Sequence, residues 1–108
     1  IRAIEPLEGV ELMKKRRKTD NVYNLCSGPG KLCGALGITR FDSGADLCAD
    51  ELYILDKPLS ESAKILVSPR INIDYAEEYR DVLWRFFLAD NRFVSKVPKK
   101  YCAEEYKK

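Results

Sequence analysis

The stretch at residues 25–38, Leu-Cys-Ser-Gly-Pro-Gly-Lys-Leu-Cys-Gly-Ala-Leu-Gly-Ile, constrains the fold more than any other part of the chain. Ser27 and Gly28 are good N-cap residues, and Pro29 suits the first helical position because its missing N–H is not needed there. An apolar face follows, and Gly37 is well placed to end the helix. The stretch therefore predicts a helix over residues 29–36.

The start of this helix favours an anion. Free backbone N–H groups and the positive end of the helix dipole meet Lys31 in the first turn. The alternative is a plain capped helix whose lysine lies in solvent, which is the commoner outcome for such a motif. A Walker phosphate loop is excluded because no Ser or Thr follows Lys31.

Cysteine and histidine usage limits the chemistry of the chain. Its 108 residues include four cysteines and no histidine, and Cys-x-x-Cys spacing is absent. This pattern argues against a zinc site and favours free thiols over disulfides. Without histidine, any proton abstraction must come from a carboxylate or from another chain.

Positive charge is concentrated rather than high. The net charge of +2 does not by itself indicate a nucleic-acid partner, but Lys14-Lys15-Arg16-Arg17-Lys18 places cations together near the end of an expected helix. Such a run is typical of a solvated helix terminus, and a phosphate-binding surface is the alternative.

Hydrophobic spacing predicts a mixture of short helices and strands separated by loops. Helices are expected at residues 7–18, 29–36 and 76–82, with a frayed helix from Tyr101. Strands are expected at residues 1–4, 52–55, 64–67 and 85–88, with strand-like alternation at 71–73, and residues 19–24 are expected to form a mobile loop. The pattern indicates an α+β fold.

Short motifs along the chain carry a family resemblance. They are Arg2-Ala-Ile-Glu-Pro-Leu-Glu-Gly9, Met13 with Arg16-Arg17, residues 25–38, Asp46-Leu47, Ser68-Pro69-Arg70-Ile71, Trp84-Arg85-Phe86-Phe87 and Val94-Ser95. Together they closely resemble the alkyladenine (methylpurine, or 3-methyladenine) DNA glycosylase family. The resemblance spans nearly the whole chain but covers the C-terminal half of that family's single domain. It implies that residues 1–108 work with an N-terminal companion fragment of the same protein.

The resemblance also implies a fold and an activity. The fold would be α+β, with a mixed, mainly antiparallel sheet and flanking helices, like the C-terminal domain of formyltransferases. The activity would be base-excision repair: a monofunctional glycosylase flips an alkylated or deaminated purine, of the 3-methyladenine, 7-methylguanine or hypoxanthine type, and hydrolyses its N-glycosidic bond with an activated water. It implies no metal or other cofactor, double-stranded DNA carrying a damaged purine as partner, and no membrane. The location would be intracellular: the nucleus in a eukaryote, or the cytoplasm in a bacterium.

Site residues follow from the same resemblance. A glutamate upstream of Ile1 would be the general base, while Arg2 and the backbone carbonyl of Ile71 position the water. This is physically coherent, because an ionised carboxylate needs a cation to fix its geometry and a carbonyl accepts a proton of the water. Contacts to DNA are expected at Arg17, Ser27, Gly28, Lys31, Ile71 and Asn72.

Asn72 departs from the family pattern, which commonly has glycine at this position. Glycine permits positive φ and a close approach of the backbone to DNA. Asparagine tolerates left-handed geometry better than most residues, so the bend can survive, although its side chain can crowd a phosphate.

The aromatic segment around Trp84 has two interpretations. A stacking platform for bases could be formed by Tyr75, Tyr79, Trp84, Phe86 and Phe87. Core packing is favoured for the run at residues 84–87, with Arg85 as a structural ion-pair partner. For the whole chain, the alternatives to a glycosylase half are a non-catalytic nucleic-acid-binding fragment that lacks the general base, and a proteolytic fragment with no role of its own.

Overall fold

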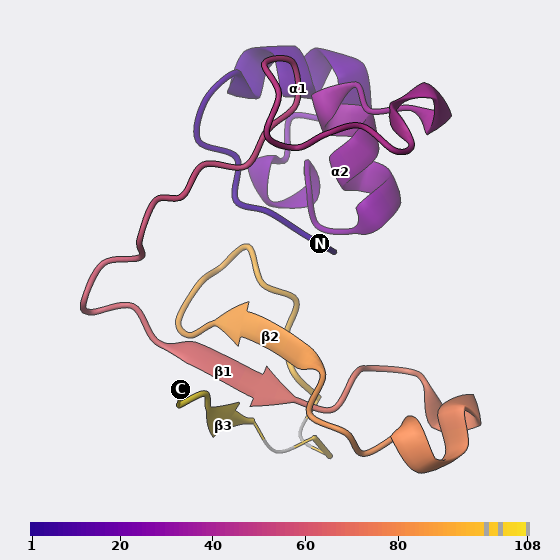
Figure 1. Cartoon of the computed structure of the whole chain (residues 1–108), viewed down its shortest axis with the longest axis vertical. Helices are drawn as coiled ribbons and strands as arrows, with labels where there is room; N and C mark the ends of the chain where they lie inside the picture. Colours follow the sequence, from indigo (N-terminus) through magenta and orange to yellow (C-terminus); the bar gives the residue numbers. More distant parts are fainter. Residues whose placement is uncertain (99, 102, 108) are drawn as a thin grey trace. The chain divides into compact units, whose positions relative to one another are not determined.

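The computed structural model describes residues 1–98, 100, 101 and 103–107. The chain divides into two compact units, Ile1–Pro58 and Leu59–Lys108. The first unit holds the helices α1 and α2, and the second holds a small sheet (Figure 1).

The first helix, α1 (Val10–Arg17), is shorter than the expected 7–18. Its N-cap, Gly9, is left-handed with φ 68°, so the helix cannot extend back to Leu7. At the other end Lys18 also turns left-handed, and the last turn is entirely basic, which suits the negative end of the helix dipole.

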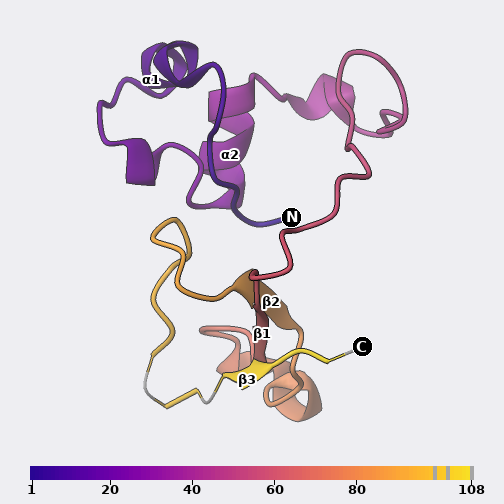
Figure 2. The same cartoon turned by 90° about the vertical axis from the view of Figure 1, so that its left-hand side faces the viewer.

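The second helix, α2 (Pro29–Leu36), has the bounds that the sequence predicts. Gly28 is the N-cap in an extended conformation, and Gly37 ends the helix at φ 70°, where its N–H donates to the carbonyls of Cys33 and Gly34. Figure 2 shows α1 nearly end-on while α2 is seen from the side, so the two helices cross.

Buried side chains of the first unit gather between the two helices and the segment that leads into α2. They are Met13, Leu25, Cys26, Leu32 and Ala35, with Ile4, Val10, Val22, Leu36 and Ile38 packed against them. Cys33 is only half-buried, so the face of α2 that packs into this core is centred on Leu32 and Ala35.

Between α1 and α2 the polar loop is partly helical, with a 3-10 turn η1 (Val22–Asn24). A second 3-10 turn, η2 (Arg40–Asp42), follows α2 and is closed by a capping box between Thr39 and Asp42.

Two strands expected in the first unit are wrong. Residues 1–4 form no strand, and only the Ile4 N–H bonds to a neighbouring segment, at the carbonyl of Cys26. Tyr53 makes an isolated bridge to Cys48, and Ile54 and Leu55 are exposed. Within the described residues of this unit, neither segment has a neighbouring strand with which to form a ladder. An apolar pattern alone is therefore not sufficient to form a strand.

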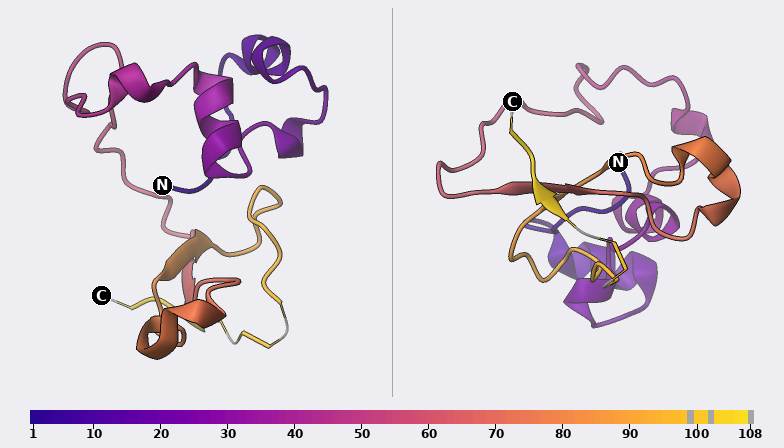
Figure 3. Two further views of the ribbon diagram at one scale, coloured as in Figure 1. Left: turned by 90° about the vertical axis from the view of Figure 1, so that its right-hand side faces the viewer. Right: turned by 90° about the horizontal axis from the view of Figure 1, so that it is seen from below.

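The second unit contains an antiparallel sheet of three strands in the order β2-β1-β3. These are β1 (Ile65–Ser68), β2 (Arg85–Leu88) and β3 (Glu104–Glu105), and Val67 of β1 lies between Phe86 of β2 and Glu104 of β3. The chain leaves β1, passes through a 3-10 segment η3 (Asp74–Tyr79) and returns in β2 (Figure 3). Helices and an antiparallel sheet together confirm the α+β class.

The outcome for the other expected elements of this unit is mixed. The strands at 64–67 and 85–88 are confirmed, the first displaced by one residue. Residues 71 and 72 form a turn rather than a strand, and the helix expected at 76–82 is the earlier 3-10 segment η3. Within the tail that was expected to be a frayed helix, Glu104 and Glu105 instead pair with Val67 and Leu66 of β1 as the strand β3.

Cys26, Cys33 and Cys48 are free thiols, in line with the expectation, while Cys102 lies outside the described residues. In the parts of the chain that the structure describes, no helix is long and apolar enough to cross a bilayer.

Candidate nucleic-acid interface

The amino end of α2 exposes backbone donors. No side chain caps the helix, and Pro29 brings no N–H. The first helical hydrogen bond runs from the Leu32 N–H to the Gly28 carbonyl and is 2.7 Å long. The N–H groups of Gly30 and Lys31 precede this bond, and no side chain caps them. Unsatisfied donors at a helix start combine with the dipole to favour an anion.

The fold of this chain does not require the two glycines at this helix start. A Cβ built on Gly28 or on Gly30 would meet nothing within 4 Å. Gly28 is extended at φ −166°, a conformation that any residue adopts, and Gly30 is helical, where alanine is favoured over glycine. The open space in front of both residues lets another molecule come close to the backbone.

Lys31 is not simply solvated, because its Nζ donates to Oδ1 of Asn24 at 2.6 Å. Asn24 is the last residue of η1, so the loop before α2 holds the lysine of its first turn. Sequence reasoning did not single out Asn24, since an asparagine in a polar loop carries no distinctive signal.

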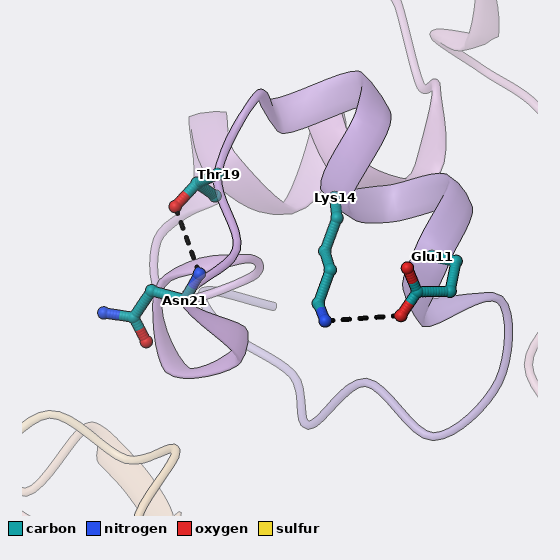
Figure 4. Close-up of polar contacts among 4 residues, drawn as sticks. All are labelled: Glu11, Lys14, Thr19 and Asn21. Atoms are coloured by element: carbon teal, nitrogen blue, oxygen red, sulfur yellow. Dashed lines mark hydrogen bonds and ion pairs between the residues drawn. The ribbon is translucent and has the colours of Figure 1, made fainter.

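The basic run 14–18 is divided by the structure into separate roles. Figure 4 shows Lys14 paired with Glu11 on the same helix, with 3.3 Å between Nζ and Oε1. Arg16 donates from Nη1 to the Ala35 carbonyl at 3.0 Å. Lys15 and Lys18 are exposed. The run is therefore not one uniform phosphate-binding surface.

Arg17, an expected DNA contact, points into the protein. Its Nε donates to the Leu25 carbonyl and its Nη2 to the Asn24 carbonyl, both at 3.2 Å. Its Cδ also lies 3.3 Å from where a Cβ on Gly34 would be. The guanidinium thus fixes the segment that leads into α2.

Arg2 and Ser27 lie on neighbouring segments. Arg2 is exposed, and two residues later the Ile4 N–H donates to the Cys26 carbonyl at 3.2 Å. Ser27 is half-buried beside the buried Cys26. Burial raises the pKa of the Cys26 thiol above its ordinary value, and the positive charge of Arg17 opposes part of this shift.

Ile71 and Asn72 belong to the second unit, where they form the turn after β1. Ile71 is half-buried, Asn72 is exposed, and Asn72 has φ 57°. Asn72 therefore adopts a left-handed bend, as expected from the tolerance of asparagine for positive φ. Arg70, in the same turn, stacks over the Trp84 ring with 5.6 Å from Cζ to the ring centroid.

The core assignment of the aromatic segment is wrong for two of its members. Trp84 is 52% exposed and Phe86 is 56% exposed, while Phe87 is half-buried. Phe86 and Phe87 are neighbours in β2 and therefore lie on opposite faces of the sheet. The Phe86 ring packs edge-to-face against Tyr106, with the ring centroids 5.3 Å apart. Trp84 stacks on Tyr79, with the ring centroids 5.5 Å apart.

Arg85 is not an ion-pair partner within the described residues. Its guanidinium stacks over Phe87 and its Nη2 donates to the Ser95 carbonyl at 3.0 Å. Its Nη1 is buried without a hydrogen-bond partner among these residues, and burial lowers the pKa of Arg85.

Within residues 1–98, 100, 101 and 103–107, no group of three His, Cys, Asp or Glu side chains could hold a metal ion.

Comparison with known proteins agrees with the resemblance in the motifs. The sequence profile of the family described as Methylpurine-DNA glycosylase (MPG) matches residues 1–92. A relative from Clostridium novyi (strain NT) is 46% identical over 104 residues, which cover 89% of this chain and 51% of the relative. A relative from Bacillus cereus (strain G9842) is 49% identical over 106 residues, which cover 89% of this chain and 52% of the relative.

Both relatives carry the name "Putative 3-methyladenine DNA glycosylase", and the chain spans about half the length of the curated relatives it matches. The profile match extends from the Arg2 segment through α1, α2 and the turn at Ile71 to the end of β2. The chain belongs to the methylpurine-DNA glycosylase family.

Proposed function

We propose that this chain is the C-terminal half of a monofunctional DNA glycosylase that removes alkylated or deaminated purines in base-excision repair. Its companion is the N-terminal half of the same protein, which supplies the general-base glutamate. The observation that carries the proposal is the family match over residues 1–92, together with relatives of about twice the length of this chain. The relatives named above are bacterial, so the proposed compartment is the cytoplasm, where the chromosome lies.

The companion half would also cover apolar surface that the chain leaves open. Ile1, Leu7 and Phe41 in the first unit are each more than three-quarters exposed, as is Tyr75 in the second. Side chains of this kind favour burial against a partner. Their exposure supports the expectation that the chain does not work alone.

In the proposed reaction a water oxygen bonds to the sugar carbon while the bond from that carbon to the purine nitrogen breaks, and the purine leaves with the electron pair of that bond. The glutamate of the companion half accepts a proton from the water. Arg2 cannot act as the base, because its guanidinium stays charged at any relevant pH. Its role is to orient the glutamate and the water, and the Ile71 carbonyl accepts a hydrogen bond from the same water.

DNA contacts of the proposed enzyme would centre on the amino end of α2. A phosphate there would meet the N–H groups of the first turn, the Ser27 hydroxyl and the Lys31 ammonium, with Gly28 leaving room for its approach. The main chain at Asn72 would approach the backbone of the DNA from its turn. Arg17 is proposed to hold the segment that leads into α2 rather than to bind a phosphate itself, since its Nε and Nη2 already donate to backbone carbonyls.

A second candidate is a non-catalytic nucleic-acid-binding fragment. The observation that favours it is the uncapped start of α2 with Lys31, which can bind a phosphate without any catalytic glutamate. Excision separates the two candidates, while DNA binding alone does not.

The test is reconstitution. Residues 1–108 are produced with a companion half taken from the Clostridium novyi relative, and excision of hypoxanthine from a duplex is measured under single-turnover conditions. Excision is expected from the pair and from neither half alone. A companion whose candidate glutamate is changed to glutamine is the matched control, because it keeps the interface and removes the base. A pair that binds the duplex without excising, or a glutamine variant that excises at the same rate, contradicts the proposal.

A further inference from the structure

The lysine at the start of α2 has a partner, Asn24, whose role goes beyond the expected contacts. We propose that Asn24 is a positioning residue for Lys31, holding its ammonium at the first turn of α2 so that it meets a DNA phosphate. The contact that carries the inference is the 2.6 Å hydrogen bond from Lys31 Nζ to Asn24 Oδ1. The inference rests on the proposed function, because it names the residue that prepares the proposed phosphate contact.

Asn24 can hold Lys31 because its own backbone is fixed on both sides. Its carbonyl accepts from Arg17 Nη2 at 3.2 Å, and its N–H donates to the Asn21 carbonyl at 3.0 Å. The next carbonyl along, that of Leu25, is bound by Arg17 Nε, and the Leu25 side chain is fully buried. The amide side chain therefore projects from a fixed backbone position.

The loop before Asn24 is also organised by its own side chains. The Asn21 N–H donates to Thr19 Oγ1 at 3.3 Å (Figure 4). Asn21 Oδ1 in turn accepts from the Tyr23 N–H at 3.1 Å. Such short side-chain-to-backbone bonds are a usual way for Thr and Asn to shape a turn. Arg17 and these turns together determine where the Asn24 amide lies.

The chemistry of the pair suits a phosphate ligand. A lysine ammonium has three donors, so one bond to Asn24 leaves two for phosphate oxygens. Asn24 is neutral, so it orients the ammonium without cancelling the charge that attracts DNA. A long lysine side chain loses rotamer freedom when it binds, and a side chain that is already held loses less.

The first experiment observes the lysine directly in the 108-residue chain. Side-chain ammonium resonances of ¹⁵N-labelled protein report the motion and hydrogen exchange of Lys31 Nζ. Asn24→Ala is expected to make this ammonium more mobile, whereas Asn24→Asp, which keeps an oxygen acceptor, is expected to leave it ordered. An ammonium equally mobile in all three proteins overturns the inference. Circular dichroism checks that each variant is folded.

The second experiment measures binding of the reconstituted pair to a duplex with a stable abasic analogue, over a range of salt concentrations. Lys31→Ala is expected to weaken binding and to lower the salt slope by about 0.9, because one phosphate contact is lost. Asn24→Ala is expected to weaken binding by about threefold to tenfold. Its salt slope should stay as in the unchanged protein, because the lysine charge remains.

The double variant separates positioning from a general effect on the loop. If Asn24 acts through Lys31, adding Asn24→Ala to Lys31→Ala causes no further loss, whereas a structural effect adds to it. Wild-type affinity in Asn24→Ala, beside a weakened Lys31→Ala, overturns the inference and leaves the phosphate contact standing. Wild-type affinity in Lys31→Ala overturns the phosphate contact itself and the inference with it.

Discussion

The Arg16 guanidinium reaches from the last turn of α1 to the carboxyl end of α2, where Nη1 donates to the Ala35 carbonyl at 3.0 Å. That carbonyl is one of the last four in α2, which have no partner within the helix. The guanidinium also lies against Gly37, since a Cβ on Gly37 would be 3.3 Å from Arg16 Cζ. Arg16 belongs to a basic run that was expected to lie in solvent or to bind phosphate. Its guanidinium instead caps the carboxyl end of α2.

Gly37→Ala is expected to destabilise the first unit more than Gly9→Ala does. Both glycines are left-handed, at φ 70° and 68°, so alanine costs about 1 kcal/mol of backbone strain at each. Only at Gly37 does the new Cβ come as close as 3.3 Å to another group, so the Arg16 guanidinium must shift by a few tenths of an ångström. This strain on the Arg16 contact adds up to about 1 kcal/mol. Urea unfolding of the two variants measures the difference. In an Arg16→Ala background this difference should vanish, and its persistence would contradict the contact.

Gly30→Ala is expected to change stability and DNA binding in opposite directions. Alanine in the first turn should stabilise α2 by up to about 1 kcal/mol, because nothing lies within 4 Å of the new Cβ. The same methyl group would obstruct a phosphate at the helix start, so duplex binding by the reconstituted pair should weaken. Thermal unfolding and fluorescence anisotropy measure the two effects, and unchanged affinity would show that no phosphate comes close there.

Arg2→Ala is expected to slow single-turnover excision by about 100-fold in the reconstituted pair, because the water and the glutamate lose their orienting cation. Binding to a duplex with an abasic analogue should remain nearly intact. Arg2→Lys should rescue little, since a point charge does not reproduce the planar fork. Lys15→Ala, which removes an exposed cation elsewhere in the unit, serves as the charge control. Equal losses of binding and rate would argue against the assignment.

Asn72→Gly is expected to be nearly neutral for folding and to strengthen duplex binding. Asn72 has φ 57°, which glycine adopts without strain, and the smaller residue leaves more room for a phosphate. Asn72→Ala keeps a Cβ but loses the tolerance of asparagine for positive φ, so it should lower the free energy of unfolding by about 1 kcal/mol. Parallel unfolding and binding curves test both variants. Weaker binding in Asn72→Gly would mean that the amide itself contacts DNA.

The stability of the first unit is expected to fall as the pH rises past about 9 because of Cys26. Burial raises the pKa of this thiol above its ordinary value of 9.0, so the folded protein keeps its proton at a pH where the unfolded chain releases it. The stabilisation is complete below the unfolded pKa and is lost as the pH rises toward the folded pKa. Urea unfolding between about pH 7 and pH 10 measures it. Cys26→Ala should flatten this part of the curve, and an unchanged slope would assign the effect to other groups.

Local chemistry in the sequence was sufficient for α2. Pro29 at the first position and Gly37 at the left-handed end specify its bounds within a few residues of chain, so no distant contact is needed. The same is true of the bend at Asn72, because asparagine tolerates positive φ. The strand at 85–88 could also be predicted locally, from its apolar composition and from the turn that follows it.

Only the tertiary structure decided the roles of the basic run and the pairing of the strands. In sequence, Arg16 and Arg17 are two cations among five. In space, their guanidinium groups bond to the carbonyls of Ala35, Asn24 and Leu25, which are brought to them by the packing of α1 on α2. Residues 52–55 and 64–67 both predict strands from their apolar side chains, yet the first stretch makes only an isolated bridge at Tyr53. The second stretch enters a sheet, between β2 and β3. Side-chain type and local spacing determine how a segment begins and ends, whereas the partner of a cation or a strand edge depends on contacts between residues distant in sequence.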